Sequence, residues 1–288
     1  PGDDEARPAV VLVSRLAKIL LLGAALLYLA VPIVAALLYS VSGRWTSNMF
    51  PDYYTLAHWA NALTDQRLLM SLWRSVWMGL AVLVLDLLIV VPAVYWQRVR
   101  NPRIRAFTEL SAAIPFVLPF VVIAFGILRV TGATAPHLLG TPWIIWLGHA
   151  AIAFPFLYWA VDGAMAAANV VRLNEAAQVC GASPAQALRW VVLPNISAGL
   201  AAGGMLVFAT SFGEFALVQI LAGARFENVS LYSLDLLAQT TSQVEKLAVL
   251  TIITFIVLFA ISVGVVYANR GQLGRLLPGS RAIGEQGG

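Results

Sequence analysis

Six runs of apolar residues, each about as long as a membrane-spanning helix, constrain the fold of this chain more than any other feature. A helix needs roughly 20 such residues to cross a hydrocarbon core about 30 Å thick. The composition agrees, since 60% of the 288 residues are hydrophobic and 11% are charged, against about 45–50% and 25% in soluble domains. We therefore predict an all-α integral membrane protein with six transmembrane helices. The predicted spans are residues 16–41, 70–95, 107–130, 143–161, 196–222 and 247–267.

Basic residues predict the orientation, because Lys and Arg near the ends of spans are preferentially retained in the cytoplasm. With the N-terminus inside, twelve of the 18 Lys and Arg residues fall in cytoplasmic segments or their borders and the other six outside. The cluster RVRNPRIR at residues 98–105 is the strongest single indication. We expect a multi-pass protein with both termini in the cytoplasm. The net charge of +4 follows from this topology and does not indicate a nucleic-acid surface.

The chain is expected to form a single membrane domain over residues 1–288. No repeat of 20–50 residues and no low-complexity linker divides it. The first span has an apolar run longer than that of a secretory signal, and we expect it to remain as an anchor.

Residues 166–195, between the fourth and fifth predicted spans, contain the polar-edged helical pattern EAAQVCGASPAQALRWVVLP. Asn174 is predicted to cap a first short helix, which places the Glu175 carboxylate in the opening turn, where it interacts favourably with the helix dipole. Gly181 can adopt the left-handed conformation that ends a helix. A tight joint is therefore predicted at Gly181.

A second short helix is predicted to start directly after this joint. Ser183 supplies a hydroxyl cap, Pro184 suits the first helical position, and Gln186 completes a capping box. Two interpretations of the pair of helices are open on these grounds. They form either a docking element for another protein or a surface elbow that packs on its own bundle.

The same loop carries a spaced pattern formed by Glu175, Ala176, Ala177, Gly181, Val191, Leu193 and Pro194. This pattern resembles the EAA signature of permease subunits of binding-protein-dependent ABC importers of the type I fold. Val191 stands where the family usually has Ile. The location before the second-last span also fits, and the resemblance covers approximately residues 70–267 and a preceding helix. It implies the importer permease fold and the plasma membrane of a prokaryote.

The resemblance further implies that residues 166–195 form a cytoplasmic coupling loop, which seats in a cleft of a separate ATP-hydrolysing subunit. The residues assigned to this contact are Glu175, Ala176, Ala177, Gly181, Ala182, Ser183, Pro184, Leu193 and Pro194. The implied partners are two ATP-binding subunits, a second permease subunit that is the same or a related chain, a soluble substrate-binding protein and the lipid bilayer. ATP and Mg²⁺ would be bound by the partner ATPase.

The chain itself is expected to be non-catalytic and to hold no cofactor or metal. A phosphate-binding P-loop requires a lysine that follows glycine. The two lysines of the chain are Lys18 in LAKIL and Lys246 in VEKLA, and neither fits that pattern. His58, His137 and His149 do not fall into a spacing typical of a catalytic or metal site.

Polar residues within the spans are candidates for a translocation path or gate, because buried charge in a membrane is costly. Glu214 lies in TSFGEFALVQ beside Thr210, Ser211 and Gly213, a polar stretch able to open a helix locally. Permeases for polyamines, iron and sulfate carry a similar acidic-aromatic element, so the resemblance implies a path or gate residue at Glu214. Asp86 interrupts the second span. For both carboxylates, a structural hydrogen bond or ion pair is the alternative interpretation.

Glycine and proline residues within the spans predict packing and bends. Gly199 and Gly203 form a small-x-x-x-small pair, which is typical of closely packed helices. Pro115 and Pro119 are expected to bend the third span or to free its backbone locally.

The function implied by the resemblance is ATP-driven import of a small polar solute. The stretches SFGEF and PDYYTLAHW are similar to the polyamine, aminoethylphosphonate and ferric-iron branch, of which a polyamine or an aminoethylphosphonate-like solute is favoured. One alternative is a secondary transporter driven by an ion gradient, with Asp86 and Glu214 as coupling carboxylates. Another is a non-transporting scaffold whose loop recruits a cytosolic protein.

Overall fold

The computed structural model describes residues 6–45, 48–239 and 243–269, without the side chains of residues 6–16 and Arg44. This part of the chain is mostly helical, and its strands are a short antiparallel pairing of β1 (Ser42–Arg44) with β2 (Tyr53–Tyr54). It divides into two compact units, one formed by Pro1–Asp65 and Leu236–Phe255 and the other by Gln66–Asp235 and Ile256–Gly288. The single membrane domain and the cytoplasmic location of both termini stay predictions, and residues 1–5 and 270–288 lie outside the described residues.

The first unit contains α1 (Ala6–Val41), the β1–β2 pairing and α2 (Ala57–Thr64). No residue in the most apolar stretch of α1 is buried in the described structure, as expected for a helix that faces lipid or another subunit. The Trp59 indole donates a hydrogen bond to Ser40 Oγ over 3.3 Å and so ties α2 to the end of α1. Lys246 forms an ion pair with Asp65 within the same unit.

The second unit holds most of the helices. In chain order its α-helices are α3 (Gln66–Val99), α4 (Arg105–Val117), α5 (Phe120–Thr134), α6 (Pro142–Ala167), α7 (Val170–Val179), α8 (Pro184–Gln186), α9 (Leu193–Asn195), α10 (Ser197–Phe212) and α11 (Ala216–Leu221). The shorter turns are the 3₁₀-helices η1 (Pro102–Ile104), η2 (Pro136–Leu138) and η4 (Gly223–Phe226) and the π-helix η3 (Ala187–Val192). The helices α12 (Val229–Ala238) and α13 (Val244–Ala268) contribute residues to both units.

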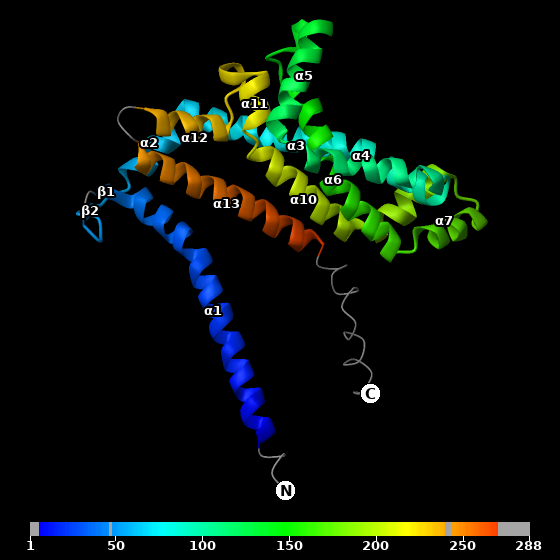
Figure 1. Ribbon diagram of the computed structural model, residues 1–288, viewed down its shortest axis with the longest axis horizontal. Helices are drawn as coiled ribbons and strands as arrows, with labels where there is room; N and C mark the ends of the chain where they lie inside the picture. The colour runs from blue at the N-terminus through cyan, green and yellow to red at the C-terminus, as the bar shows by residue number, and fades with distance from the viewer. Residues whose placement is uncertain (1–5, 46–47, 240–242, 270–288) are drawn as a thin grey trace. The chain divides into compact units, whose positions relative to one another are not determined.

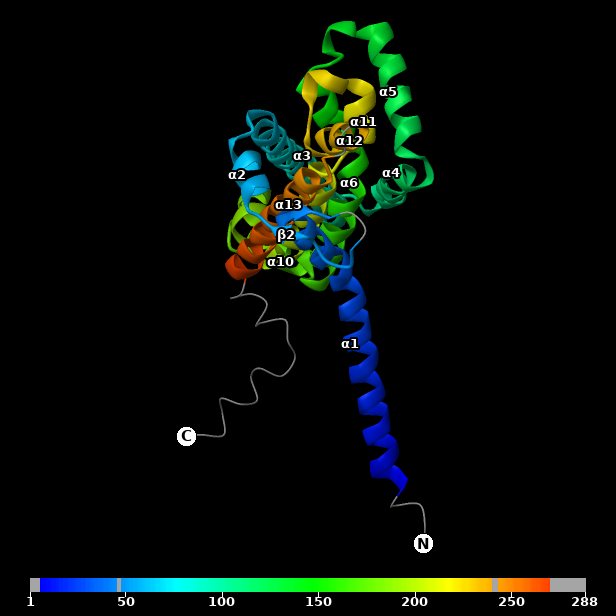
Figure 2. The same ribbon diagram turned by 90° about the vertical axis from the view of Figure 1, so that its left-hand side faces the viewer.

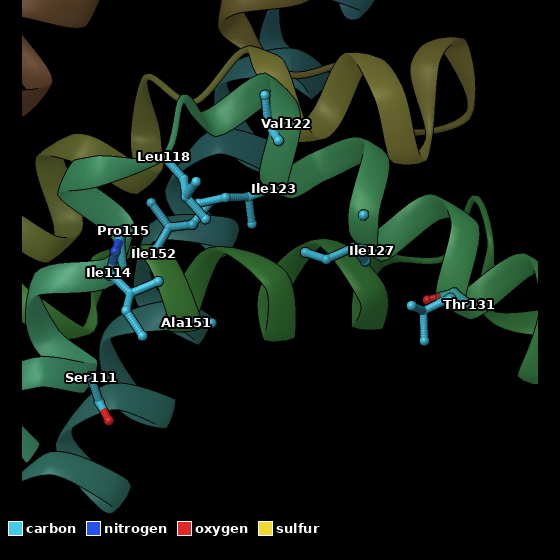
Figure 3. A pocket seen from close by; sticks show the side chains of 12 residues that line it. Ser111, Ile114, Pro115, Leu118, Val122, Ile123, Ile127, Thr131, Ala151 and Ile152 are labelled. Carbon is cyan, nitrogen blue, oxygen red and sulfur yellow. The ribbon is translucent and has the colours of Figure 1, made fainter. Parts of the chain in front are cut away.

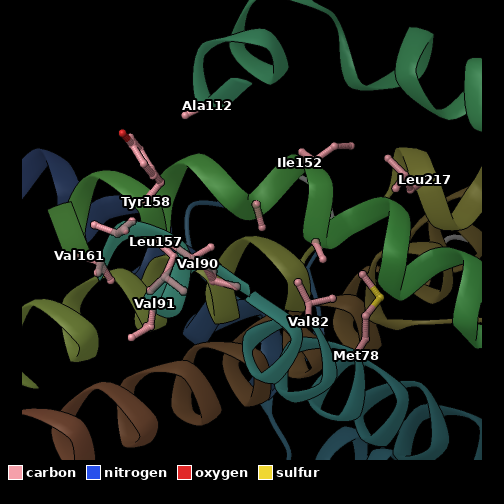
Figure 4. Packing of buried hydrophobic residues seen from close by; sticks show 14 of the residues in the cluster. Met78, Val82, Val90, Val91, Ala112, Ile152, Leu157, Tyr158, Val161 and Leu217 are labelled. Carbon is pink, nitrogen blue, oxygen red and sulfur yellow. The ribbon is translucent and has the colours of Figure 1, made fainter. Parts of the chain in front are cut away.

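The core of the second unit lies around α6, which packs against α3 and α10 (Figure 1). Branched and aromatic side chains such as Val82, Val90, Leu157 and Val161 fill the interior, and Leu217 of α11 extends the cluster (Figure 4). Most of the apolar stretch of α6 is buried, which distinguishes it from the largely exposed α1 and α13. A helix that is apolar all round is expected to lie at the centre of a bundle.

The close packing predicted at Gly199 and Gly203 is confirmed. A Cβ atom on Gly199 would lie 2.3 Å from the Ala164 Cβ atom, and one on Gly203 would lie 2.7 Å from the Ala160 Cβ atom. Four small residues thus bring the backbones of α6 and α10 together.

The number of spans matches the sequence only when bends are allowed. Within the described residues, four helices are long and apolar enough to cross a membrane. Two further pairs of helices pass the same test together, so the total is six if each bent pair is one span. These pairs are Pro102–Val117 with Phe120–Thr134, bent by 105°, and Pro184–Asn195 with Ser197–Phe212, bent by 80°.

The third predicted span, residues 107–130, is not one straight helix. The chain turns sharply between α4 and α5 at Leu118 and Pro119 (Figure 2). Leu118 is extended, with φ −97° and ψ 133°, as expected for a residue that precedes proline. The bend expected at Pro119 is confirmed, whereas Pro115 is accommodated inside α4.

The fifth predicted span, residues 196–222, is not one continuous helix either, since the 80° bend lies at its start and a second break follows. The helix α10 ends at Phe212 and α11 starts only at Ala216. Gly213 and Glu214 occupy the break, which confirms that the helix opens locally in this stretch.

Candidate functional site

The loop between α6 and α10 folds into a compact element, residues 170–195, that we call the elbow. Its first half is α7, which starts after Asn169 in the left-handed conformation, with φ 50°. The prediction that Asn174 caps this helix is wrong. The helix starts five residues earlier, at Val170, and Asn174 lies buried inside it, where it accepts a hydrogen bond from Tyr95. Glu175 therefore lies in the middle of α7 and not in its first turn.

The joint of the elbow is the predicted one. Gly181 has φ 83°, a left-handed conformation that glycine adopts without steric cost. The Ala182 amide donates to the Ala177 carbonyl over 3.0 Å, and the Gly181 amide donates to the Gln178 carbonyl over 2.9 Å. This pair of hydrogen bonds is the Schellman motif, which satisfies the last carbonyl groups of α7.

The second half of the elbow starts with the predicted capping box. The Ser183 amide donates to Gln186 Oε1 over 2.8 Å, and the Gln186 amide donates to Ser183 Oγ over 3.4 Å. The helix then widens into the π-helix η3, in which the Leu193 amide bonds to the Leu188 carbonyl five residues earlier. Pro194 follows directly, and its missing N–H and bulky ring account for the departure from regular α-helical bonding at this point.

The outer face of the elbow presents large apolar groups to the surroundings. Val179 is 89% exposed and Trp190 is 69% exposed, with the Arg189 guanidinium 5.1 Å from the Trp190 ring centre. Glu175 and Ala176 are exposed on α7. A cluster of exposed apolar side chains beside a carboxylate is typical of a protein interaction surface.

The inner face of the elbow is fixed to the bundle. Val170, Ala177, Ala187 and Val192 are buried, and so is Ile196 directly after the elbow. The nine residues assigned to the coupling contact thus divide by burial: Glu175, Ala176, Gly181, Ser183, Pro184 and Pro194 are exposed, Ala182 and Leu193 are half-buried, and Ala177 is buried. The structure brings all of them into one element, most with an outward face.

Among the candidate residues of the translocation path, Glu214 is buried and hydrogen-bonded within the bundle. Glu214 is 6% exposed, and one carboxylate oxygen accepts a hydrogen bond from the Leu217 amide over 2.7 Å, so that it caps α11. Its other oxygen lies 3.7 Å from Nδ1 of His149, which is 1% exposed. This distance is too long for a direct hydrogen bond. Neither ring nitrogen of His149 has a hydrogen-bond partner within the described residues.

One further polar residue, Asn228, contacts Glu214. Asn228 is buried, donates to the Glu214 carbonyl over 2.5 Å and accepts from the Leu231 amide over 3.1 Å. Sequence reasoning did not select Asn228, and it set His149 aside as outside any catalytic or metal spacing. A polar residue in an apolar run is the signal that marks His149, whereas Asn228 follows Glu227 in a polar stretch and has no such signal.

The remaining path candidates differ in exposure and in hydrogen bonding. Thr210 is exposed and bonds to the Leu206 carbonyl over 2.8 Å, Gly213 is exposed, and Ser211 is buried. Asp86 is buried within α3, and its Oδ2 atom has no hydrogen-bond partner among the described residues.

A cavity of about 610 Å³ opens where α4 bends into α5, beside α6 (Figure 3). Its lining is apolar, with Ile114, Leu118, Ile127 and Ile152 among the residues, and Ser111 and Thr131 are the polar exceptions. Sites for charged solutes need several converging polar groups. The cavity therefore does not have the lining of a binding site for such a solute.

Comparison with known proteins relates this arrangement to membrane transport. The family described as "Binding-protein-dependent transport system inner membrane component" matches residues 87–271, which include the elbow and Glu214. An ABC transporter permease protein of Streptomyces antibioticus, ORF1, is 30% identical over 175 residues, which are 59% of this chain and 73% of that protein. The 2-aminoethylphosphonate transport system permease protein PhnV of Salmonella typhi is 26% identical over 189 residues, 66% of this chain and 71% of that protein.

A solved structure shows a related fold. The crystal structure of a bacterial ABC transporter involved in the import of the acidic polysaccharide alginate contains a chain that is similar with a TM-score of 0.65 at 18% identity. The similarity covers 90% of this chain and 96% of that one.

Proposed function

Because the chain belongs to the family of binding-protein-dependent transport system inner membrane components, we propose that it forms the translocation path of an importer and receives energy from a separate ATPase through the elbow. The coarser statement, that the chain is a permease subunit of an ABC importer, follows from the family itself.

The observation that supports coupling through the elbow is its two-sided construction. One face is buried against the bundle through Val170, Ala177 and Val192. The opposite face exposes Glu175, Val179 and Trp190. An element of this kind transmits a rigid displacement, because it is fixed on one side and available for docking on the other.

The proposal includes the partners and the orientation. The elbow would lie in the cytoplasm together with both termini, and two ATP-binding subunits would each bind ATP and Mg²⁺. A second permease subunit, identical or related, would complete the path, and a soluble binding protein would deliver the solute from outside. This chain would carry no catalytic residue and no cofactor.

Purification of the tagged chain from its native membranes tests the proposal. We expect an ATPase to co-purify, and reconstitution of the complex in liposomes to give solute uptake that requires ATP. Glu175→Lys should leave insertion of the chain intact and reduce the captured ATPase, whereas Asp52→Lys, the same charge change between β1 and β2, should not. ATP-dependent uptake by a complex in which Glu175→Lys has no effect would contradict coupling through this face.

For the substrate we propose a small amino compound, with an aminoethylphosphonate-like solute or a polyamine as the candidates. The similarity to PhnV supports the first of these. Uptake of radiolabelled 2-aminoethylphosphonate and of radiolabelled spermidine by vesicles that contain the complex and its binding protein would decide between them. Transport of neither solute would reject this substrate class while leaving the importer assignment intact.

The alternative is a transporter driven by an ion gradient, with Asp86 and Glu214 as coupling carboxylates. The same vesicles distinguish it. Uptake that continues without ATP and stops when an ionophore dissipates the gradient would favour the alternative.

A further inference from the structure

We propose that Tyr95 is the positioning residue that transmits movement of the elbow to the transmembrane helices, an inference that rests on the proposed function. Tyr95 lies in the last turns of α3, 79 residues before its partner in the elbow. Its ring is buried, so the hydroxyl is the part of the side chain that makes directional contacts.

The Tyr95 hydroxyl contacts both halves of the elbow. It donates a hydrogen bond to Asn174 Oδ1 in α7 over 2.6 Å, and the Pro184 carbonyl oxygen at the start of α8 lies 3.3 Å from it. Asn174 is 3% exposed and directly precedes Glu175 on the docking face. A short hydrogen bond between two buried groups has a defined geometry, so movement of α7 displaces the end of α3 with it.

The end of α3 is in turn held by the neighbouring helices. Gln97 Nε2 donates to the Tyr158 hydroxyl of α6 over 3.1 Å, and Thr108 Oγ1 of α4 donates to Gln97 Oε1 over 2.5 Å. Arg98 forms an ion pair with Asp162 of α6 over 2.6 Å.

Three residues in the last turns of α3 therefore reach three different helices. Tyr95 holds α7, Gln97 holds α4 and α6, and Arg98 holds α6 one turn further along. Within this group, Tyr95 makes the side-chain hydrogen bonds to the elbow. Loss of its hydroxyl should uncouple the elbow from the bundle without removing the docking face.

Tyr95→Phe in the assembled complex tests this role, because it removes one oxygen and leaves the ring packed. We expect complex assembly and the rate of ATP hydrolysis to stay within about twofold of the wild type. The number of solute molecules transported per ATP should fall roughly five- to tenfold, the factor expected from the loss of one buried hydrogen bond. Tyr232→Phe, which removes the same atom from a buried tyrosine of α12, should not change the ratio.

A double-mutant cycle with Asn174→Ala separates the contact from general damage to the fold. Asn174→Ala should lower the ratio to the same extent as Tyr95→Phe, and the double variant should show no further loss. An unchanged ratio in Tyr95→Phe, a matching loss in Tyr232→Phe, or additive losses in the double variant would each overturn the inference. Failure of the wild-type complex to require ATP would instead reject the proposed function.

Discussion

The contact between Gly199 of α10 and Ala164 of α6 offers the sharpest test of the packing at the base of the elbow. The two helices enter and leave the elbow, and the backbones approach closely because Gly199 has no side chain. In Gly199→Ala, the new Cβ atom would lie 2.3 Å from the Ala164 Cβ atom and 3.1 Å from the Ala160 carbonyl oxygen. Carbon atoms in contact are normally about 3.5–4.0 Å apart. The helices must therefore separate by roughly 1.5 Å at this point.

The change in the free energy of unfolding of Gly199→Ala follows from two opposing effects. Overpacking of a tight contact costs about 1–3 kcal/mol, and alanine is a better helix former than glycine by up to about 1 kcal/mol. We expect a net loss of roughly 1–2 kcal/mol in the free energy of unfolding. In a chain of this size, the loss corresponds to a decrease in Tm of about 2–3 °C.

Size-exclusion chromatography of the purified protein in detergent after heating to a series of temperatures measures this decrease in Tm. Gly163→Ala is the matched control, because Gly163 also lies in the α6 region next to Ala164 and a Cβ atom there meets nothing within 4 Å. We expect Gly163→Ala to leave the Tm unchanged or to raise it. The swap Gly199→Ala with Ala164→Gly should recover most of the loss, because it removes the other Cβ atom of the contact.

Two results would contradict the prediction for Gly199→Ala. A Gly199→Ala variant as stable as Gly163→Ala would show that α6 and α10 are not held at the distance described. A swap that restores nothing would show that the loss arises elsewhere in the bundle.

Further predictions concern the elbow and its attachment. Gly181→Ala should destabilise the protein by about 1–2 kcal/mol because φ is 83°, and Gly181→Asn should be milder, a ranking that Tm values check directly. Ser183→Ala should lower the free energy of unfolding by about 0.5–1 kcal/mol, because the Gln186 amide loses its capping acceptor. Faster amide exchange at the start of α8 would measure this loss. Asp162→Asn should lower the free energy of unfolding by about 1.5 kcal/mol or more, because the charged hydrogen bond from Arg98 is weakened. An unchanged Tm in this variant would show that the ion pair contributes little to stability.

The parts of the structure that could be predicted from the sequence are those set by local chemistry or by apolar length. The joint at Gly181 and the capping box of Ser183 with Gln186 depend on hydrogen bonds between residues a few positions apart, and the sequence contains all of that information. The apolar runs likewise predicted the helical membrane fold. The bend at Pro119 followed from proline chemistry, although its angle of 105° did not.

The errors arose where a distant residue decides the structure. Asn174 has the side chain of a helix cap, but Tyr95, 79 positions earlier, provides a buried donor that holds it inside α7. The proximity of His149 to Glu214 depends on the packing of α6 against the break after α10 and has no local signature. Long-range pairings of this kind require the fold to be known first.

The bundle uses two kinds of contact, and their placement indicates how a displacement would travel through it. The end of α3 that faces the elbow is held by directional hydrogen bonds and by the Arg98 ion pair, which fix distance and angle. The interior of the same helix contacts its neighbours through Met78, Val82 and Val90, and apolar contacts of this kind are non-directional. If the elbow is displaced as proposed, the end of α3 would move together with the ends of α4 and α6 that it contacts. Relative motion would then be confined to the apolar interior and to the breaks at Pro119, which has no amide hydrogen to donate, and at Gly213, where α10 ends.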